Sequence, residues 1–285
     1  GKIKLCCQQP LDKSLVHLTG SRLTNVTTRL LRELISHGQM VQDNVLNVFL
    51  EILTTKNRIN YLSTFFIHIL QRDKKWDNAK RWFNDSDRRP CSYRPTLQSP
   101  VILIPCHVHG NHWVALIRRI QNNRVHFYYS DDMNHPPTEQ ALKHLLQTST
   151  DNTFYPDNAK WIKCHSLTYR PHSNECGPRT LFALTVLGLH QEPNMHSLMP
   201  FMTSNLAQIL RTWVASSILS GEVHVPTLPD SIEIIRTDYG HSTPYNLIQW
   251  TAQGPSLEGT ENATRTRSIK ITPPKSTTSE ELGKA

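Results

Sequence analysis

The chain has 285 residues, of which 38% are hydrophobic and 19% are charged, and its formal net charge is +8. This length and balance are typical of a globular protein with a large core. No apolar run approaches the ~18 residues that a membrane-spanning helix needs, and no signal-peptide pattern opens the chain, so we expect no membrane partner. The positive charge alone does not identify a partner, because acidic proteins, nucleic acids and solubility all favour it.

The six cysteines are spread irregularly and form no CxxC motif. This number is too low for a disulfide framework in a chain of this size, so the cysteines indicate a reducing compartment. We therefore expect an intracellular protein, in the nucleus, the cytoplasm or both. The cysteines are Cys6, Cys7, Cys91, Cys106, Cys164 and Cys176.

The N-terminal third of the chain is predicted to be helical. Residues 1–20 are mixed in composition and predict no element. Apolar residues then recur at helical spacing over 23–38 and, more strongly, over 41–53. Two further helices are expected over 61–70 and 79–83, before a proline-punctuated loop.

The pattern then changes to short apolar strands. Residues 101–105 are wholly apolar, and 112–120 and 124–129 predict two strands joined as a hairpin through a Gln-Asn-Asn turn. A helix with leucines at 142, 145 and 146 follows, and 161–164 predicts another strand. Helices followed by strands with flanking helices indicate the α+β class.

The rest of the chain divides into a core and a tail. A polar loop leads into an apolar run at 181–187, and a long helix is expected from about 206 to 218. From about 251 the sequence is rich in Ser, Thr, Pro and Gly, which is typical of disorder. The predicted divisions are an uncertain N-terminal segment, a folded domain, a C-terminal extension and a disordered polar tail, at 1–20, 21–225, 226–250 and 251–285.

Cys176 is the candidate nucleophile because of its place before this apolar run. Pro178 suits the first turn of a helix, which would put Cys176 at the helix N-terminus. The partial positive charge there favours a thiolate, and the free N–H groups can stabilise an oxyanion. A buried structural cysteine is the alternative interpretation.

His112 and Asp131 are the candidate base and its orienting acid. His112 begins one strand of the predicted hairpin and Asp131 follows the other, and hairpin pairing places these two ends side by side. A thiol nucleophile needs a base that a third group holds in place. Asp132 and Asn134 are alternative orienting residues.

The sequence contains residues of two other types of functional site. Cys106, His107 and His109 have ligand types that bind zinc, but no second ligand pair stands at a recognisable spacing, so we expect no metal. The basic pairs 88–89 and 118–119 lack interleaved aromatic residues, so a solvated surface is expected and nucleic-acid binding is not.

Several motifs in this order resemble a known family. A His-Trp pair opens a strand at 112, a Tyr-x-Asp ends the next strand at 131, and a Cys-Gly opens a helix at 176. They resemble the ubiquitin-like-protein-specific (SUMO-protease-like) cysteine proteases and, more distantly, the adenovirus protease. Segments at 40–49, 81–83 and 101–105 extend the resemblance over about 38–220. It implies a papain-like cysteine peptidase fold with a mixed central sheet flanked by helices.

The resemblance also implies roles for single residues. It makes Cys176 the nucleophile, His112 the base and Asp131 its orienter. Trp113 would help to roof the narrow channel that takes the modifier's Gly-Gly tail, and Asp43 matches an acidic position that contacts the modifier in some members.

The sequence departs from the family pattern at two positions. The family usually has Gln six residues before the cysteine, where it donates to the oxyanion, and this chain has Arg170, which can also donate. Met40 stands where the family has a Trp that lines the channel, so the channel here is expected to be wider or less aromatic.

The expected function is a thiol protease that cleaves after the Gly-Gly-type C-terminus of a ubiquitin-like modifier, with no cofactor. Its partners would be the modifier or its protein conjugates, and the protein is expected to be a monomer. A deubiquitinase, a viral or transposon-type processing protease and an acyltransferase on the same scaffold remain alternatives. So does a modifier-binding module whose catalytic site has decayed.

Overall fold

A computed structural model gives the fold of the protein over most of the chain. Within the part it describes, no helix combines the length and the apolar character needed to cross a membrane. The described residues are 7–9, 14–17, 25–36, 39–57, 59–84, 96–164, 174–198 and 206–225.

A mixed five-stranded sheet forms the centre of the molecule; the family resemblance implies a mixed sheet, and the sequence pattern predicts four of its strands. Its outer pairs, β3 with β4 and β6 with β7, are parallel, whereas β4, β5 and β6 run antiparallel to one another. Asn122 and Asn123 close the β5–β6 hairpin with φ angles of 50° and 57°, which Asn tolerates better than most residues. In spatial order the strands are β3 (Asn60–Tyr61), β4 (Val101–Val108), β5 (His112–Gln121), β6 (Arg124–Ser130) and β7 (Lys160–Lys163).

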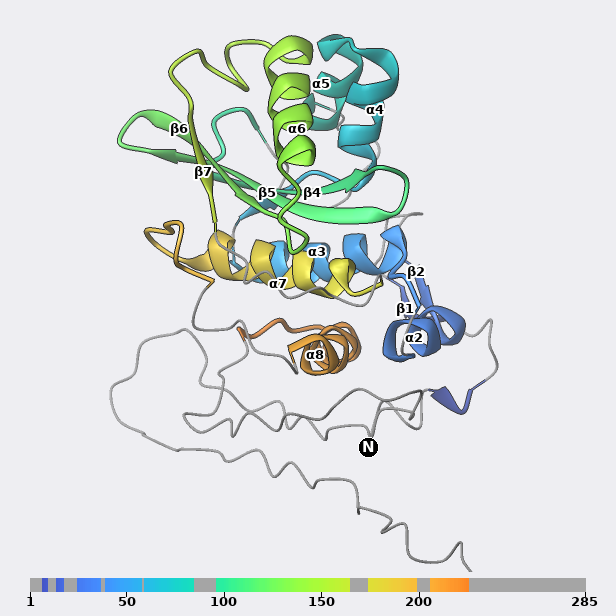
Figure 1. Ribbon diagram of the computed structural model, residues 1–285. Helices are drawn as coiled ribbons and strands as arrows, with labels where there is room; N and C mark the ends of the chain where they lie inside the picture. The colour runs from blue at the N-terminus through green and yellow to red at the C-terminus, as the bar shows by residue number, and fades with distance from the viewer. Residues whose placement is uncertain are drawn as a thin grey trace, which may run out of the picture.

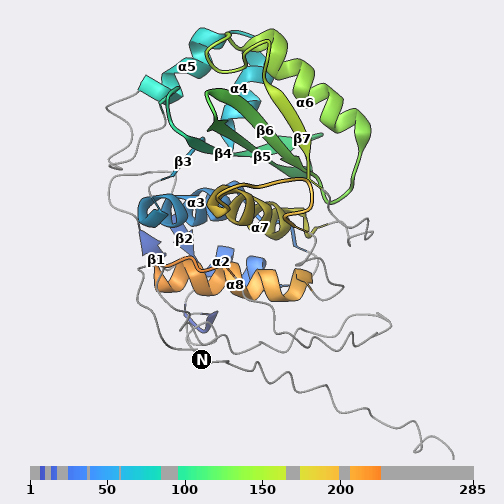
Figure 2. The same cartoon turned by 90° about the vertical axis from the view of Figure 1, so that its left-hand side faces the viewer.

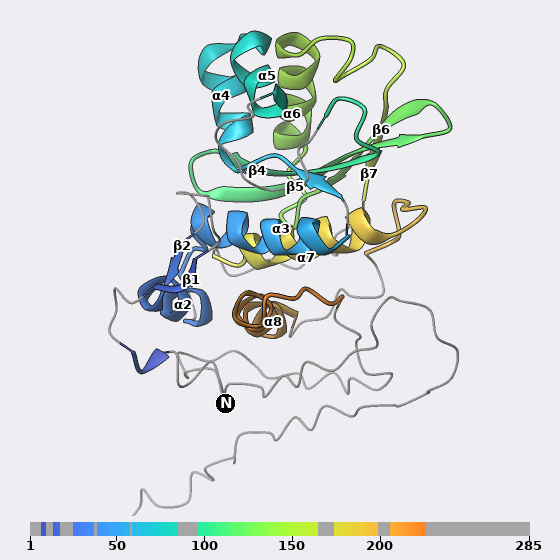
Figure 3. The ribbon, with the colours of Figure 1, turned by 180° about the vertical axis from the view of Figure 1, so that it is seen from behind.

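Helices cover both faces of the sheet (Figure 1). On one face lie α4 (Phe65–Asp73), α5 (Trp76–Asn84) and α6 (Pro136–Ser149). On the other lie α3 (Asp43–Asn57) and α7 (Cys176–Leu189), with α2 (Thr28–Ile35) and α8 (Leu206–Ser220) packed beyond them. The view from behind shows the same layers (Figure 3).

Each face of the sheet has its own hydrophobic core. Side chains alternate along a strand, so Ile102, Ile104 and Cys106 face α4–α6, whereas Leu103 faces α3 and α7. This burial on both faces explains why the sequence of β4 is a nearly continuous apolar run.

Helix α7 lies across the sheet beside α3 (Figure 2). Every residue from Cys176 to Gly188 is buried, because the helix is packed between the sheet and α8. A Cβ at Gly188 would lie 2.6 Å from Leu103 Cδ2, so glycine allows the helix to approach β4 closely. The helix that carries the candidate nucleophile is therefore a central part of the fold.

The elements near the N-terminus differ from the prediction. Val26 lies in β2 (Asn25–Thr27), which pairs with β1 (Ser14–His17), and not in the predicted helix. The helix begins only at Thr28 because Thr27 caps it, its side chain accepting a hydrogen bond from the Leu30 N–H at 3.4 Å. Similarly, Tyr61 pairs with β4, so the helix predicted from there begins at Phe65.

Arg118 and Arg119 are buried and do not form the solvated surface that the sequence predicted. Arg118 donates to the carbonyl oxygens of Phe154 and Thr153 at 3.0 and 3.1 Å. Arg119 donates to three carbonyl oxygens at and beyond the C-terminal end of α7, at 2.8–3.0 Å. Both guanidinium groups therefore satisfy buried loop and helix-end carbonyls.

Candidate active site

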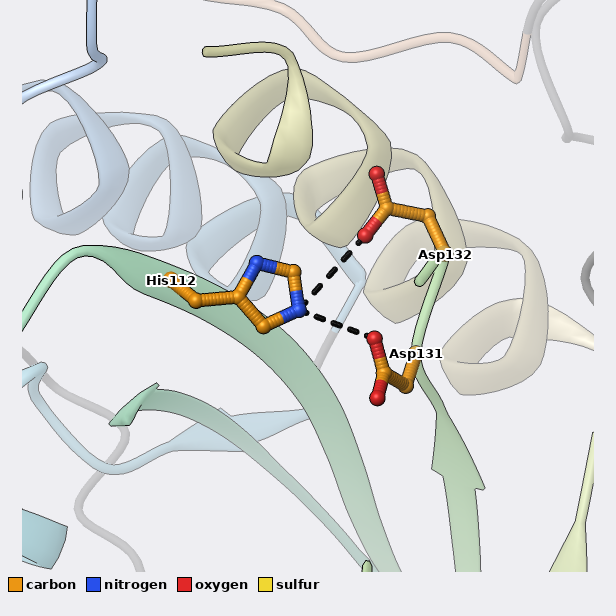
Figure 4. Close-up of side chains that lie close together, drawn as sticks. All are labelled: His112, Asp131 and Asp132. Carbon is orange, nitrogen blue, oxygen red and sulfur yellow. Dashed lines mark hydrogen bonds and ion pairs between the residues drawn. The ribbon is translucent and has the colours of Figure 1, made fainter. Parts of the chain in front are cut away.

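His112 and Asp131 lie together, as the hairpin pairing predicted. His112 is the first residue of β5 and is 6% exposed, and Asp131 directly follows β6. His112 Nε2 lies 2.8 Å from Asp131 Oδ1 (Figure 4). The antiparallel register brings the beginning of one strand beside the end of the other, and this positions the pair.

The carboxylate of Asp131 is held by several donors. Oδ1 accepts from the Met133 N–H at 2.9 Å, and Oδ2 accepts from the Tyr129 hydroxyl and the His135 N–H, each at 3.1 Å. Burial alone would raise the pKa of Asp131, but its hydrogen bonds with His112 and these backbone groups hold the pKa below the ordinary value. Asp131 is therefore an ionised acceptor fixed in one orientation.

Cys176 lies close enough to His112 to raise the pKa of the imidazole. Because Nε2 bonds Asp131, Nδ1 is the ring nitrogen left to interact with the sulfur. Burial alone would lower the pKa of His112, but the hydrogen bond with Asp131 and the interactions with Cys176 and Asp132 together raise it to about 10. His112 is thus a cation at neutral pH, and a neighbouring cation favours a thiolate.

Cys176 is also placed by its helix. It is the first residue of α7 and is 5% exposed. The side chain of Glu175, at the N-cap position, makes no capping hydrogen bond to the helix. The first-turn N–H groups have no acceptor within the helix, and the helix dipole favours negative charge near the sulfur.

Trp113 and the segment before α3 form a buried wall beside the site. The Trp113 indole N–H donates to the Val41 carbonyl oxygen at 3.2 Å, and its ring lies 4.4 Å from that of His107. Val41 in turn packs against Gly177, where a Cβ would lie only 2.7 Å from Val41 Cβ. This contact ties the first turn of α7 to residues 39–42.

The structure describes three of the other residues predicted for the site and does not describe the fourth. Met40, next to Val41, is partly exposed, and Asp43 is half-buried at the start of α3, where its charge raises the pKa of His107 against the effect of burial. Asn134 lies in the turn after Asp131, with a φ of 48°. Arg170 lies outside the described residues.

Asp132 is the second carboxylate of the site and was considered as the orienting acid. Its Oδ1 is 3.7 Å from His112 Nε2, beyond hydrogen-bond distance, whereas Asp131 lies at 2.8 Å. Burial raises the pKa of Asp132 to about 6, although the nearby charges of His112 and Arg179 act to lower it. The geometry therefore favours Asp131.

Two groups of potential metal ligands differ in their arrangement. His112, Asp131 and Asp132 have ligand atoms within 4.8 Å of one another, but His112 and Asp131 already use those atoms in their hydrogen bond. The zinc alternative at Cys106 is not supported, because Cys106 faces α4–α6 whereas His107 packs on Trp113 at the other face of the sheet.

Sequence reasoning missed three charged residues near the site. Glu175 and Arg179 flank the start of α7, and Arg211 of α8 donates to the carbonyl oxygen of Asn174, two residues before Cys176, at 2.6 Å. Glu175 and Arg179 border an apolar helix, and their charge there is a signal that could have drawn attention to them.

Comparisons with known proteins identify the family of the chain. Residues 39–220, more than half of the chain, match the Ulp1 protease family, C-terminal catalytic domain. No curated protein matches the chain.

Solved structures of the SUMO protease Ulp1 share the fold. One has its catalytic cysteine oxidised to a sulfinic acid, and it matches at 15% identity over 77% of this chain and 92% of that chain, with a TM-score of 0.57. Another is the C-terminal Ulp1 protease domain in complex with Smt3, the yeast ortholog of SUMO, at 15% identity over 77% and 93%, also with a TM-score of 0.57. The chain therefore belongs to the Ulp1 protease family and contains its cysteine peptidase domain.

Proposed function

We propose that this protein is a thiol protease that cleaves after the Gly-Gly-type C-terminus of a ubiquitin-like modifier. Cys176 would be the nucleophile, His112 the base and Asp131 the residue that orients His112. The observation that carries the proposal is the buried imidazole of His112, which hydrogen-bonds a buried carboxylate and lies close enough to Cys176, at the start of α7, for Cys176 to raise its pKa. That contact also opposes the interpretation as a decayed binding module.

The first half of the reaction would form an acyl-enzyme. The thiol proton of Cys176 already resides on His112 in a thiolate–imidazolium pair, and the thiolate attacks the carbonyl carbon of the modifier's terminal glycine. The tetrahedral intermediate carries a negative charge on oxygen. When it collapses, the carbon–nitrogen bond breaks and His112 gives its proton to the leaving amine.

The second half would release the modifier. A water molecule loses a proton to His112 and attacks the thioester carbon. The carbon–sulfur bond then breaks, which frees a carboxylate and restores Cys176. Throughout, Asp131 would hold the ring in the orientation in which Nδ1 faces the sulfur, because it accepts from Nε2.

Stabilisation of the oxyanion would come from the start of α7. The Cys176 backbone N–H lies at the positive end of the helix, where N–H groups have no partner within the helix. We assign a second donor to Arg170, in the position where the family usually has Gln.

The choice of substrate rests on similarity and on the residues beside the site. The solved Ulp1 domain of the same fold binds Smt3. Here Trp113 donates a hydrogen bond to Val41, which follows Met40, precedes Asp43 by two positions and packs against Gly177 in the first turn of α7. A modifier tail ending in glycines would suit such a place, because glycine has no side chain to clash with the tryptophan.

The direct test is cleavage of modifier precursors. The protein is incubated with SUMO-type, ubiquitin and other modifiers that carry a short C-terminal extension. The masses of the products are then measured by mass spectrometry. We expect a product that ends at Gly-Gly from at least one modifier and none with Cys176→Ser. Cleavage of the ubiquitin precursor alone would support a deubiquitinase, and no cleavage of any precursor would contradict the proposal.

A further inference from the structure

Asp132 is a buried carboxylate, 7% exposed, and within the described part of the chain neither of its side-chain oxygens has a hydrogen-bond partner. Two cationic groups lie near it, His112 Nε2 at 3.7 Å and Arg179 Nε at 3.9 Å. Burying a carboxylate costs free energy unless charges or hydrogen bonds compensate it, and these two cations help to compensate Asp132.

Arg179 is unusual for its place in the helix. It lies in the first turn of α7, where the helix dipole disfavours a cation. Two carboxylates offset this: Asp132, and Glu175 with its Oε2 3.8 Å from Arg179 Nη2. Asp132, Arg179 and Glu175 therefore form a buried charge row that leads from His112 to the residue before Cys176.

The charge row connects the ends of β5 and β6, which carry His112 and Asp131, to α7, which begins at Cys176. Figure 4 shows Asp132 on the side of His112 that faces α7, with Asp131 nearer β6. A side chain in this position acts on the imidazole through its charge and not through a hydrogen bond, because 3.7 Å is too long for one.

We propose that Asp132 is a positioning residue for the reaction: held by Arg179 against α7, it provides a second negative charge that keeps His112 protonated beside Cys176. This inference rests on the proposed function. It assigns Asp131 and Asp132 different tasks, since Asp131 orients the ring by a hydrogen bond and Asp132 stabilises its charge.

The charged groups around His112 agree with this division. Asp131 and Asp132 from the end of β6 and Cys176 from α7 all raise the pKa of His112, whereas burial lowers it. His107 of β4 interacts with His112 as a like charge. Arg179 lowers the pKa of Asp132 and so favours its charged form.

The test uses Asp132→Asn, which keeps the shape of the side chain and removes its charge. Alkylation of Cys176 by iodoacetamide is followed by mass spectrometry of the Cys176 peptide across pH, because the rate reports the thiolate–imidazolium pair without any substrate. The pKa of His112 is read in parallel from its ¹⁵N imidazole signals, assigned by their loss in His112→Gln.

In Asp132→Asn, we expect the pKa of His112 to fall by about one pH unit, as loss of a charge within 4–6 Å predicts, and the alkylation profile to move with it. The control Asp77→Asn removes a charge from the exposed surface of α5 and should leave both unchanged. Thermal melts show whether each variant is folded.

Two variants test the role of Arg179. Arg179→Met should raise the pKa of the Asp132 carboxyl above about 6, read from its ¹³C signal, whereas Arg179→Lys should keep it near the wild-type value. A carboxyl pKa that does not move in Arg179→Met would overturn the ion pair.

The outcomes separate this inference from the proposed function. If Cys176 alkylation depends on His112 but not on Asp132, the triad stands and the role of Asp132 is wrong. If alkylation of Cys176 does not depend on His112 at all, the proposed function fails, and the role of Asp132 fails with it.

Discussion

At the scale of single residues, the two adjacent aspartates differ in their distance from His112 and in the hydrogen bonds that they accept. Asp131 accepts a 2.8 Å hydrogen bond from His112, whereas Asp132 lies 0.9 Å farther away, at 3.7 Å. Asp131 is further fixed by the backbone N–H groups of Met133 and His135. The turn after β6 therefore immobilises the carboxylate of Asp131, and this is why Asp131 and not Asp132 orients His112.

Replacing Asp131 by Asn should lower kcat/KM by about 10²–10⁴-fold, because the ring of His112 loses the acceptor that selects its orientation. The alkaline limb of the pH profile should also move to lower pH. This limb moves to lower pH because the hydrogen bond with Asp131 raises the pKa of His112. Loss of that bond therefore lowers the pH at which the imidazolium deprotonates. Steady-state kinetics from pH 5 to 10 measure both, and unchanged kcat/KM in Asp131→Asn would contradict the assignment.

Arg170 gives a second test at this scale. If its side chain donates to the oxyanion, Arg170→Ala should lower kcat by about 10-fold or more with little change in KM. Arg170→Gln restores the usual family residue and should keep or increase kcat. Equal activity of the Ala variant and the wild type would assign the oxyanion to backbone groups alone.

At the scale of elements, the position of the nucleophile depends on how closely α7 approaches residues 39–42. Gly177→Ala would place a Cβ 2.7 Å from Val41 Cβ, so the first turn of α7 must shift. A displacement of about 1 Å at a nucleophile costs about 10²-fold in rate, and we expect kcat/KM to fall by that order.

The matched variant for this experiment changes both residues of the contact. Gly177→Ala combined with Val41→Gly removes the clashing Cβ of residue 41 and should recover part of the lost kcat/KM. No loss in Gly177→Ala alone would mean that the contact does not position Cys176.

Arg211 joins three elements at a buried point. Its guanidinium donates to the carbonyl oxygens of Leu34 and Gln39 at 2.7 Å each and of Asn174 at 2.6 Å. Since charged hydrogen bonds contribute about 1.5–3 kcal/mol each and are not additive, Arg211→Met should lower the free energy of unfolding by about 2–4 kcal/mol. Urea denaturation measures this, with the exposed Arg124→Met as a control that should change little.

At the scale of the whole molecule, periodicity predicted most of the fold. The apolar runs gave β4 to β7 and α3 to α8 to within a few residues, and strand pairing brought His112 to Asp131. The predictions that were wrong concerned residues whose structure depends on contacts with segments distant in the sequence. Val26 joins a strand because β1 lies beside it, and Arg118 is buried because a loop supplies carbonyl oxygens.

The charge row beside the site also depends on contacts between segments that are distant in the sequence. Asp132 and Arg179 are 47 positions apart, and nothing in their local sequence indicates that these two side chains form an ion pair. The triad residues could be predicted because each begins or follows an element, where spacing is informative. The ion pairs that surround them could be found only in the folded chain.

The most direct test of the central claim is covalent capture of the protein by ubiquitin-like modifiers that carry a C-terminal electrophile. We expect an adduct with the mass of one modifier added, absent in Cys176→Ala and weakened in His112→Ala. No adduct with any modifier, together with a generic alkylating reagent that labels Cys176 no faster than the other cysteines, would show that Cys176 is not the nucleophile of a modifier protease.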